Sequence, residues 1–136
     1  GKHMEMSFHD NKVHGIEFID EDYSCLFVID IDHIQEWIKE ESTFSFKIQP
    51  SKLVFADVSS FSIKMERTNL TINSYLDTIL NIESAPVEGK NVRMYVIEML
   101  GGNCIELEST GYSLEYFGKS VVKSEQYLTK SERGNA

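Results

Sequence analysis

The stretch RMYVIEMLGGNCIELES, residues 93–109, decides the fold of this 136-residue chain. Its first half is rich in β-branched and aromatic residues, which favour strands. In its second half Glu106 and Glu108 alternate with apolar residues, as in a strand with one buried and one exposed face. The pair Gly101-Gly102 lies between the two halves, and glycines supply the positive φ values that a tight hairpin turn requires. The stretch therefore predicts two antiparallel strands joined by a short turn.

Strand patterns continue on both sides of this hairpin. Residues 109–111, Ser-Thr-Gly, predict a turn into a third consecutive antiparallel strand over residues 112–117. Strands are also expected within residues 52–57 and 60–67, where apolar residues alternate with polar ones or β-branched residues are dense. Residues 12–19 are expected to pair with residues 23–31 across the polar turn at residues 20–22.

Residues 23–37, YSCLFVIDIDHIQEW, predict a central strand that runs into a short helix. The strand is apolar on both faces up to residue 31, as expected of a strand covered on both sides. Asp32 is followed three residues later by Gln35, which resembles a capping box, so we expect a helix to begin at Asp32. Residues 74–84 fit a helix or a strand equally well.

About seven to nine strands with one or two short helices predict a mainly β fold, either an antiparallel β-sandwich or a partly open barrel. The length suits one domain. We expect residues 1–5 to be a cloning remnant and disordered start, residues 6–118 to form a single β-rich domain, and residues 119–136 to be a polar, loosely packed tail. No secretory signal is visible, and no apolar run approaches the roughly 20 residues that a membrane helix needs.

Acidic residues outnumber basic ones and limit the classes of partner. The chain has 22 Asp and Glu against 13 Lys and Arg, a formal net charge of -9, and the excess lies entirely before residue 118. An acidic body repels the phosphates of nucleic acids and anionic membranes, so we expect neither as a partner. A basic protein or a cation matches this charge better, although solubility alone is also a sufficient reason for it.

The sequence predicts no enzyme. Cys25 and Cys104 lie in apolar, strand-like runs, so we expect two buried, reduced thiols in a cytoplasmic protein. Neither thiol adjoins a basic residue that would activate it, and the chain has no Gly-x-Ser-x-Gly elbow and no phosphate-binding loop. We therefore expect no catalytic residue and no cofactor.

Asp30, Asp32 and His33 form the one set in the sequence that resembles a metal site. Residues two apart on a strand share a face about 6 to 7 Å apart, so both carboxylates could reach calcium or magnesium. A second interpretation needs no metal: Asp32 caps the helix, Asp30 binds a backbone donor or a cation, and His33 is exposed in the first helical turn. The sequence leaves both open.

His9, Asp10 and His14 are weaker candidates near the first long strand. Neighbouring residues in an extended chain point in opposite directions, so we do not expect His9 and Asp10 to pair with each other. His14 is expected on the same strand face as Ile16 and Phe18, partly buried and hydrogen-bonded.

Short motifs in residues 8–117 resemble a loosely defined group of small uncharacterised bacterial proteins. The motifs are Phe8-His9-Asp10, Val28-x-Asp30-x-Asp32-x-Ile34-x-x-Trp37, Pro50-x-x-Leu53-Val54-Phe55-x-x-Val58 and a late Gly-Tyr before an aromatic strand. Such proteins are similar to some immunity proteins of polymorphic toxin systems, in which a small acidic domain blocks a basic effector. The resemblance implies no catalytic or binding residue.

Three hypotheses follow from these observations. The first is a non-catalytic protein-binding module, an immunity-type inhibitor of a basic partner. The second is a divalent-cation-binding domain or enzyme centred on Asp30, Asp32 and His33. The third is an assembly domain that pairs through an exposed sheet edge. The sequence does not determine the oligomeric state.

Overall fold

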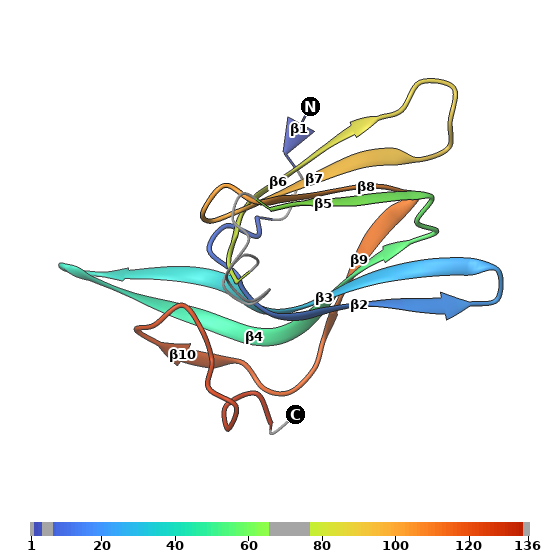
Figure 1. The fold of residues 1–136 in the computed structure, drawn as a ribbon. Coiled ribbons are helices and arrows are strands. Elements are labelled where there is room, and N and C mark those ends of the chain that lie inside the picture. The colour runs from blue at the N-terminus through green and yellow to red at the C-terminus, as the bar shows by residue number, and fades with distance from the viewer. Residues whose placement is uncertain (1, 4–6, 66–76, 135–136) are drawn as a thin grey trace.

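Two antiparallel β-sheets face each other in the protein (Figure 1). The structure, a computed structural model, describes residues 2–3, 7–65 and 77–134. The predicted mainly β, sandwich-like fold is confirmed. The one or two predicted short helices are not found in the described residues, which form the strands β1 (Lys2–His3), β2 (Lys12–Glu21), β3 (Ser24–Glu40), β4 (Thr43–Ala56), β5 (Ser60–Lys64), β6 (Ile79–Pro86), β7 (Arg93–Met99), β8 (Cys104–Ser109), β9 (Gly111–Tyr116) and β10 (Val121–Lys123).

The strand order places the two longest strands at the centre of one sheet. Sheet A has the order β1-β6-β7-β8-β5, and sheet B has the order β10-β4-β3-β2. Strand β4 is long enough to pair with β3 along one edge and with two strands, β10 and then β9, along the other. Strands β5 and β2 therefore end their sheets on the same side of the sandwich, where the rings of Phe18 and Phe61 lie 4.7 Å apart.

Both hairpins that the sequence predicts are confirmed. Strands β7 and β8 pair around Gly101 and Gly102, whose φ angles are 101° and 94°. Strands β2 and β3 pair around Asp22 and Tyr23, both of which have positive φ, as a tight primed turn requires. The turn thus lies one residue later than the predicted one.

The prediction of three consecutive strands after residue 93 is wrong at its last strand. Strand β9 pairs with β4 in sheet B and not with β8 in sheet A. The buried Ser109 hydroxyl donates to the carbonyl of Ala56 at 2.5 Å, and the Thr110 amide donates to the same carbonyl at 3.1 Å. These bonds fasten the end of β8 to β4, so the chain crosses between the sheets at Thr110.

The predicted helix from Asp32 is also wrong, because β3 continues to Glu40. A bulge between Ile34 and Glu36 inserts one extra residue into β3. Ile34 therefore pairs with Ile48, and Trp37 pairs with Phe46. The partners are two apart and share a face, so Ile34 and Trp37, three apart, share that face too. The three-residue spacing of Ile34 and Trp37, which is also typical of a helix, results here from the bulge. Of residues 74–84, those from Ile79 onward form strand β6, and residues 74–76 lie outside the described residues.

The main core fills the space between the sheets. Fully buried side chains from both sheets meet there, and aromatic rings add edge contacts such as that of Phe55 with Tyr95, whose centroids lie 5.0 Å apart. Burial of such side chains is worth about 1.5 to 3 kcal/mol each. The largest of them are Phe27, Ile29, Ile31, Leu53, Phe55, Ile79, Ile97, Ile105 and Leu107.

Within residues 119–134, the segment from Val121 to Arg133 is packed and does not form the loose tail that the sequence predicts. Strand β10 pairs with β4, and the segment after it lies against the outer face of sheet B, on the side away from sheet A (Figure 1). Leu128, 3 % exposed, packs there with Ile34, Phe46 and Ile48. This second small core exists because the outer faces of β3 and β4 are apolar in this part of the sheet.

The two cysteines are free thiols, but both are half-buried, so the prediction that they are buried is wrong. In the described parts of the chain no helix is long and apolar enough to cross a membrane.

Candidate functional site

Asp30 and Asp32 lie side by side on the outer face of sheet B. Both belong to β3, where period-two alternation directs Phe27, Ile29 and Ile31 into the core and the two aspartates away from it. The sequence prediction that the two carboxylates share a face is confirmed, since a single arginine side chain contacts both.

Arg133 from the C-terminal segment supplies the cation beside both aspartates. One guanidinium nitrogen, Nη1, donates to Asp32, and the other, Nη2, donates to Asp30. Nη1 also lies 3.4 Å from the carbonyl oxygen of Ile31, and the guanidinium lies over the ring of Phe117, 5.4 Å from its centroid. Arg133 is only 5 % exposed. The positive charge of Arg133 is therefore paired within the fold and is not exposed to a partner.

Asp32 is fully buried, and three groups compensate its charge. Besides Arg133, its Oδ2 atom lies 2.7 Å from Nε2 of His14 and accepts a 2.8 Å hydrogen bond from the amide of Leu128. A buried carboxylate is tolerated only with such partners, because removing it from water costs several kcal/mol. Asp32 is thus the point where β2, β3 and the C-terminal segment are joined.

His14 reaches Asp32 because of a second bulge. The pairing of β2 with β3 shifts between Val13 and Gly15, so Val13 and Ile16 both pack on the core side while His14 projects to the outer face. The prediction that His14 shares a face with Ile16 and Phe18 is therefore wrong. Its expected character is confirmed: its side chain is 26 % exposed and hydrogen-bonded.

His33 points away from the two aspartates. It lies on the inner side, 3 % exposed, with Nδ1 2.8 Å from Oδ1 of Asn11 and its ring 5.2 Å from the ring of Phe8. Burial lowers the pKa of His33 from 6.5 to about 4, so the neutral ring donates from Nδ1 to Asn11. The expected set of Asp30, Asp32 and His33 is therefore not brought together, and His33 is not the exposed first-turn residue of a helix.

The remaining candidates do not build a metal site either. His9 Nδ1 lies 3.1 Å from Asp10 Oδ2, contrary to the prediction that neighbours cannot pair. The contact is possible because Asp10 has a φ of 65°, which places it in a turn and not in an extended strand. In residues 7–65 and 77–134, no three His, Cys, Asp or Glu side chains lie close enough together to hold a metal ion.

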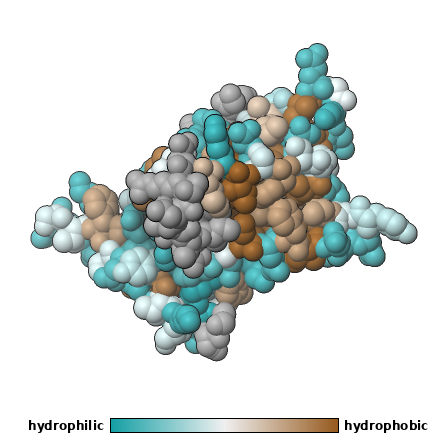
Figure 2. Space-filling model, viewed as in Figure 1, coloured by the Kyte–Doolittle hydropathy of each residue, from teal (hydrophilic) through white to brown (hydrophobic). Residues whose placement is uncertain are grey.

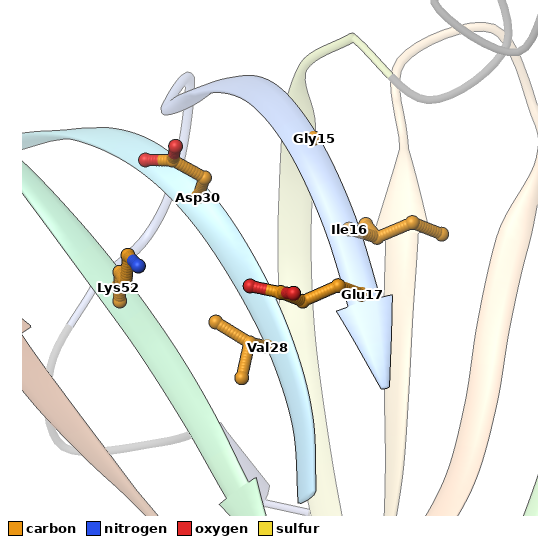
Figure 3. Close-up of a pocket in the computed structure, with 6 residues that line it drawn as sticks. All are labelled: Gly15, Ile16, Glu17, Val28, Asp30 and Lys52. Carbon is orange, nitrogen blue, oxygen red and sulfur yellow. The ribbon is translucent and has the colours of Figure 1, made fainter. Parts of the chain in front are cut away.

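A notch of about 270 Å³ opens on the outer face of sheet B beside Asp30 (Figure 3). Gly15, Asp30 and Lys52 are aligned across three strands, and Glu17 is paired with Val28 in the next row. Gly15 contributes no side chain, and Glu17 extends from β2 toward β3, whereas Ile16 points the opposite way (Figure 3). The notch therefore lies between two carboxylates, those of Glu17 and Asp30.

The outer face of sheet A is acidic as well. Across β6, β7 and β8 the register aligns Glu83 with Val96 and Glu106 in one row. On the same face, Glu98 lies in the neighbouring row on one side, paired with Cys104, and Glu108 lies in the neighbouring row on the other side, paired with Met94. Their side chains point away from the core because the alternating residues Tyr95, Ile97, Ile105 and Leu107 are buried. Two exposed cations also lie here: Lys90, 3.3 Å from Glu108, and Lys64 on β5, which the register places in the row of Glu98.

Sequence reasoning missed Arg133, which lies 101 residues from Asp32. The available signal was the uneven charge: residues 118–136 hold four basic and two acidic residues beside a strongly acidic body. Leu128, the one large aliphatic residue of the segment after β10, was a second signal that the segment packs. Neither signal identifies the partner of the arginine.

No protein-family model matches this sequence, and none of the curated proteins matches it significantly.

Proposed function

We propose that the protein is a non-catalytic binding module for a basic protein, and that it acts as an immunity-type inhibitor of that partner in the cytoplasm. The observation that carries the proposal is the exposed acidic surface. Arg133 is buried against Asp30 and Asp32, and Lys123 is held by Glu132 at 2.6 Å, so these cations of the C-terminal segment do not offset the exposed carboxylates. The exposed carboxylates are Glu17, Asp20, Glu21 and Asp22 around the end of β2 and Glu106 on sheet A, where Glu83, Glu98 and Glu108 are half-buried beside it.

Surface charge of one sign has a direct consequence for partner choice. It accelerates the encounter with a protein of opposite charge by about 10- to 1,000-fold at low ionic strength and repels nucleic acids and anionic membranes. The two free thiols, Cys25 and Cys104, support a reducing compartment such as the cytoplasm. The resemblance to immunity proteins supports the same function, because those proteins also present an acidic surface to a basic effector.

The test is affinity capture from a lysate of the source organism, with washes at low and at high salt and identification by mass spectrometry. We expect one basic protein in near-equal amount that is retained at low salt and depleted at high salt. The captured protein is then purified, and its association rate is measured against ionic strength. Capture of no protein, or an association rate that does not change with salt, would contradict the proposal.

The inhibitor part of the proposal has its own test. Cells that express the captured protein should stop growing, and co-expression of the present chain should restore growth. A variant with Glu83→Gln, Glu98→Gln and Glu106→Gln and one with Glu17→Gln, Asp20→Asn and Glu21→Gln remove three charges each from different surfaces, so they show which acidic surface is needed. Growth that is the same with and without the chain would refute inhibition.

A further inference from the structure

Within the described residues, strand β2 is an edge strand of sheet B. Its first residues are covered, since the amide of Val13 donates to the backbone carbonyl of Asp77 at 2.8 Å and Lys12 bridges to Thr78. From Gly15 to Glu21, no strand of the described chain pairs with the outer edge of β2. Natural proteins protect such edges with charged side chains, prolines and bulges. Residues 15–21, GIEFIDE, contain no lysine or proline, and their charged side chains are all acidic, so the protection acts against another acidic strand and not against a basic one.

The inner face of this edge is apolar and partly uncovered. Phe18 is 51 % exposed, although its ring lies 5.1 Å from that of Phe27 and 4.7 Å from that of Phe61. Ile16 and Ile63 are half-buried beside the main core. Figure 2 shows hydrophobic side chains gathered between the two sheets next to β2 and β5. An apolar side chain on an added strand would cover the exposed part of Phe18.

The outer face of the same edge is hollow and carries the carboxylates of Glu17 and Asp30; Lys52 lines the far side of the hollow, and Arg133 binds one oxygen of Asp30. A strand added to β2 would lie two strand spacings, about 10 Å, from Asp30 on β3. A long basic side chain on the added strand can reach a carboxylate over this distance only where no other side chain lies between the two groups. Gly15 provides this opening, and Glu17 lies on the same face two residues later.

We propose that β2 accepts a strand from a basic protein by β-strand addition. The added strand alternates apolar side chains, which pack against Phe18, with basic ones, of which one crosses Gly15 into the notch between Glu17 and Asp30. This inference rests on the proposed function, for which it names the binding surface and the pattern of the partner segment. Backbone hydrogen bonds supply affinity in this mode, and the alternating side chains supply specificity.

A second copy of the chain is the poorer occupant, because of charge. Antiparallel pairing of two β2 edges would bring Glu17, Asp20 and Glu21 of one copy beside the same residues of the other. Like charges directly opposite each other in a sheet are destabilising. A basic strand meets the same carboxylates with opposite charge.

The probe is an acetylated octapeptide in which lysine alternates with valine, titrated into the ¹⁵N-labelled full chain. We expect amide shifts concentrated in β2 and slower hydrogen exchange in residues 15–21. Two control peptides separate the contributions. Replacing lysine by glutamate should abolish binding. Methylating alternate backbone nitrogens, which keeps the charge but prevents pairing, should weaken binding at least tenfold.

Two variants test the notch. Gly15→Leu should weaken peptide binding at least tenfold by filling it, and should fold normally, since a Cβ added at Gly15 meets nothing within 4 Å. Glu17→Gln should weaken binding by up to about fivefold, the range of one exposed ion pair. Glu106→Gln on sheet A is the matched control and should leave binding unchanged. Thermal melting of each variant confirms the fold.

The outcomes that overturn the inference are distinct from those that overturn the proposed function. Equal binding of the N-methylated peptide, or binding lost in Glu106→Gln but kept in Gly15→Leu, would overturn strand addition at β2 and leave a basic partner possible at another surface. Slow exchange of residues 15–21 without peptide, or a dimer paired through β2, would also overturn it. Equal binding of the lysine and glutamate peptides would count against both proposals.

Discussion

Replacing Arg133 by alanine removes the charge that compensates a fully buried carboxylate. Breaking a buried ion pair by deleting one partner costs about 3 to 5 kcal/mol, because the remaining charge stays in the interior. Two features reduce the loss here. Asp32 keeps the hydrogen bonds from His14 and from the amide of Leu128, and the side chain of Asp30 is 35 % exposed, so water can solvate it. We therefore expect Arg133→Ala to lower the free energy of unfolding by about 2 to 4 kcal/mol.

Urea unfolding followed by tryptophan fluorescence measures this loss, since the one tryptophan, Trp37, contacts Phe46 of the second core. With a slope of about 1 to 3 kcal/mol per molar urea, the midpoint should fall by at least about 0.7 M. Lys130→Ala is the matched control, an exposed cation of the same segment, and should change the free energy of unfolding by less than about 0.5 kcal/mol.

A double-mutant cycle with Asp32→Asn assigns the loss to the pair. If the two side chains interact as the structure shows, Arg133→Ala should cost much less in the Asp32→Asn background than in the wild type, by at least about 1 kcal/mol. A loss in Arg133→Ala no larger than that in Lys130→Ala, or a cycle without coupling, would refute the reasoning.

Three further predictions test other parts of the fold. Lowering the pH from about 7 to about 4 should destabilise the protein by up to about 3 kcal/mol through His33, because its folded pKa of about 4 lies below the unfolded value of 6.5 and the unfolded chain binds more protons between them. The urea midpoint of His33→Gln should therefore vary less with pH over this range than that of the wild type, and equal pH dependence would contradict the prediction. Leu128→Ala should cost about 2 to 4 kcal/mol by opening a cavity in the second core, whereas Val122→Ala, at a residue 59 % exposed, should cost far less; equal effects in chemical unfolding would indicate a tail that does not pack. Ser109→Ala should cost about 0.5 to 1.5 kcal/mol, because it removes the hydroxyl donor at the crossing between sheets while the Thr110 amide still donates to the Ala56 carbonyl, and a thermal melt like that of the wild type would count against this role.

The buried pair of Arg133 with the two aspartates has a structural role. It fastens the C-terminal segment over a sheet face whose neighbouring part is apolar, at Ile34, Phe46 and Ile48. A hydrophobic replacement of the whole ion cluster can be as stable as the cluster itself, so the charges also direct the segment to one position on the sheet. The segment leaves Gly15 and the edge of β2 open.

Local pattern was enough to predict most strands and both hairpins. The alternation of residues 104–109 predicts a strand, and the pair Gly101-Gly102 predicts a tight turn. Both predictions need only local sequence, because strand period and turn geometry depend on neighbours in sequence. The same holds for the shared face of Asp30 and Asp32. The acidic character of the protein is likewise a property of composition alone.

Tertiary structure decided the features that depend on distant partners. The bulge beside Ile34 changes a three-residue spacing from a helical signal into a strand signal, and only the register with β4 reveals it. The bulge beside His14 directs that side chain to Asp32 for the same reason. The cation beside Asp32 comes from Arg133, 101 residues away, and is available only once β10 has paired with β4. Sequence therefore determined the strands, the tight turns and the sign of the charge, whereas packing determined which charges are buried in pairs and which remain exposed to a partner, because a carboxylate and a guanidinium far apart in sequence interact only after the fold has brought them together.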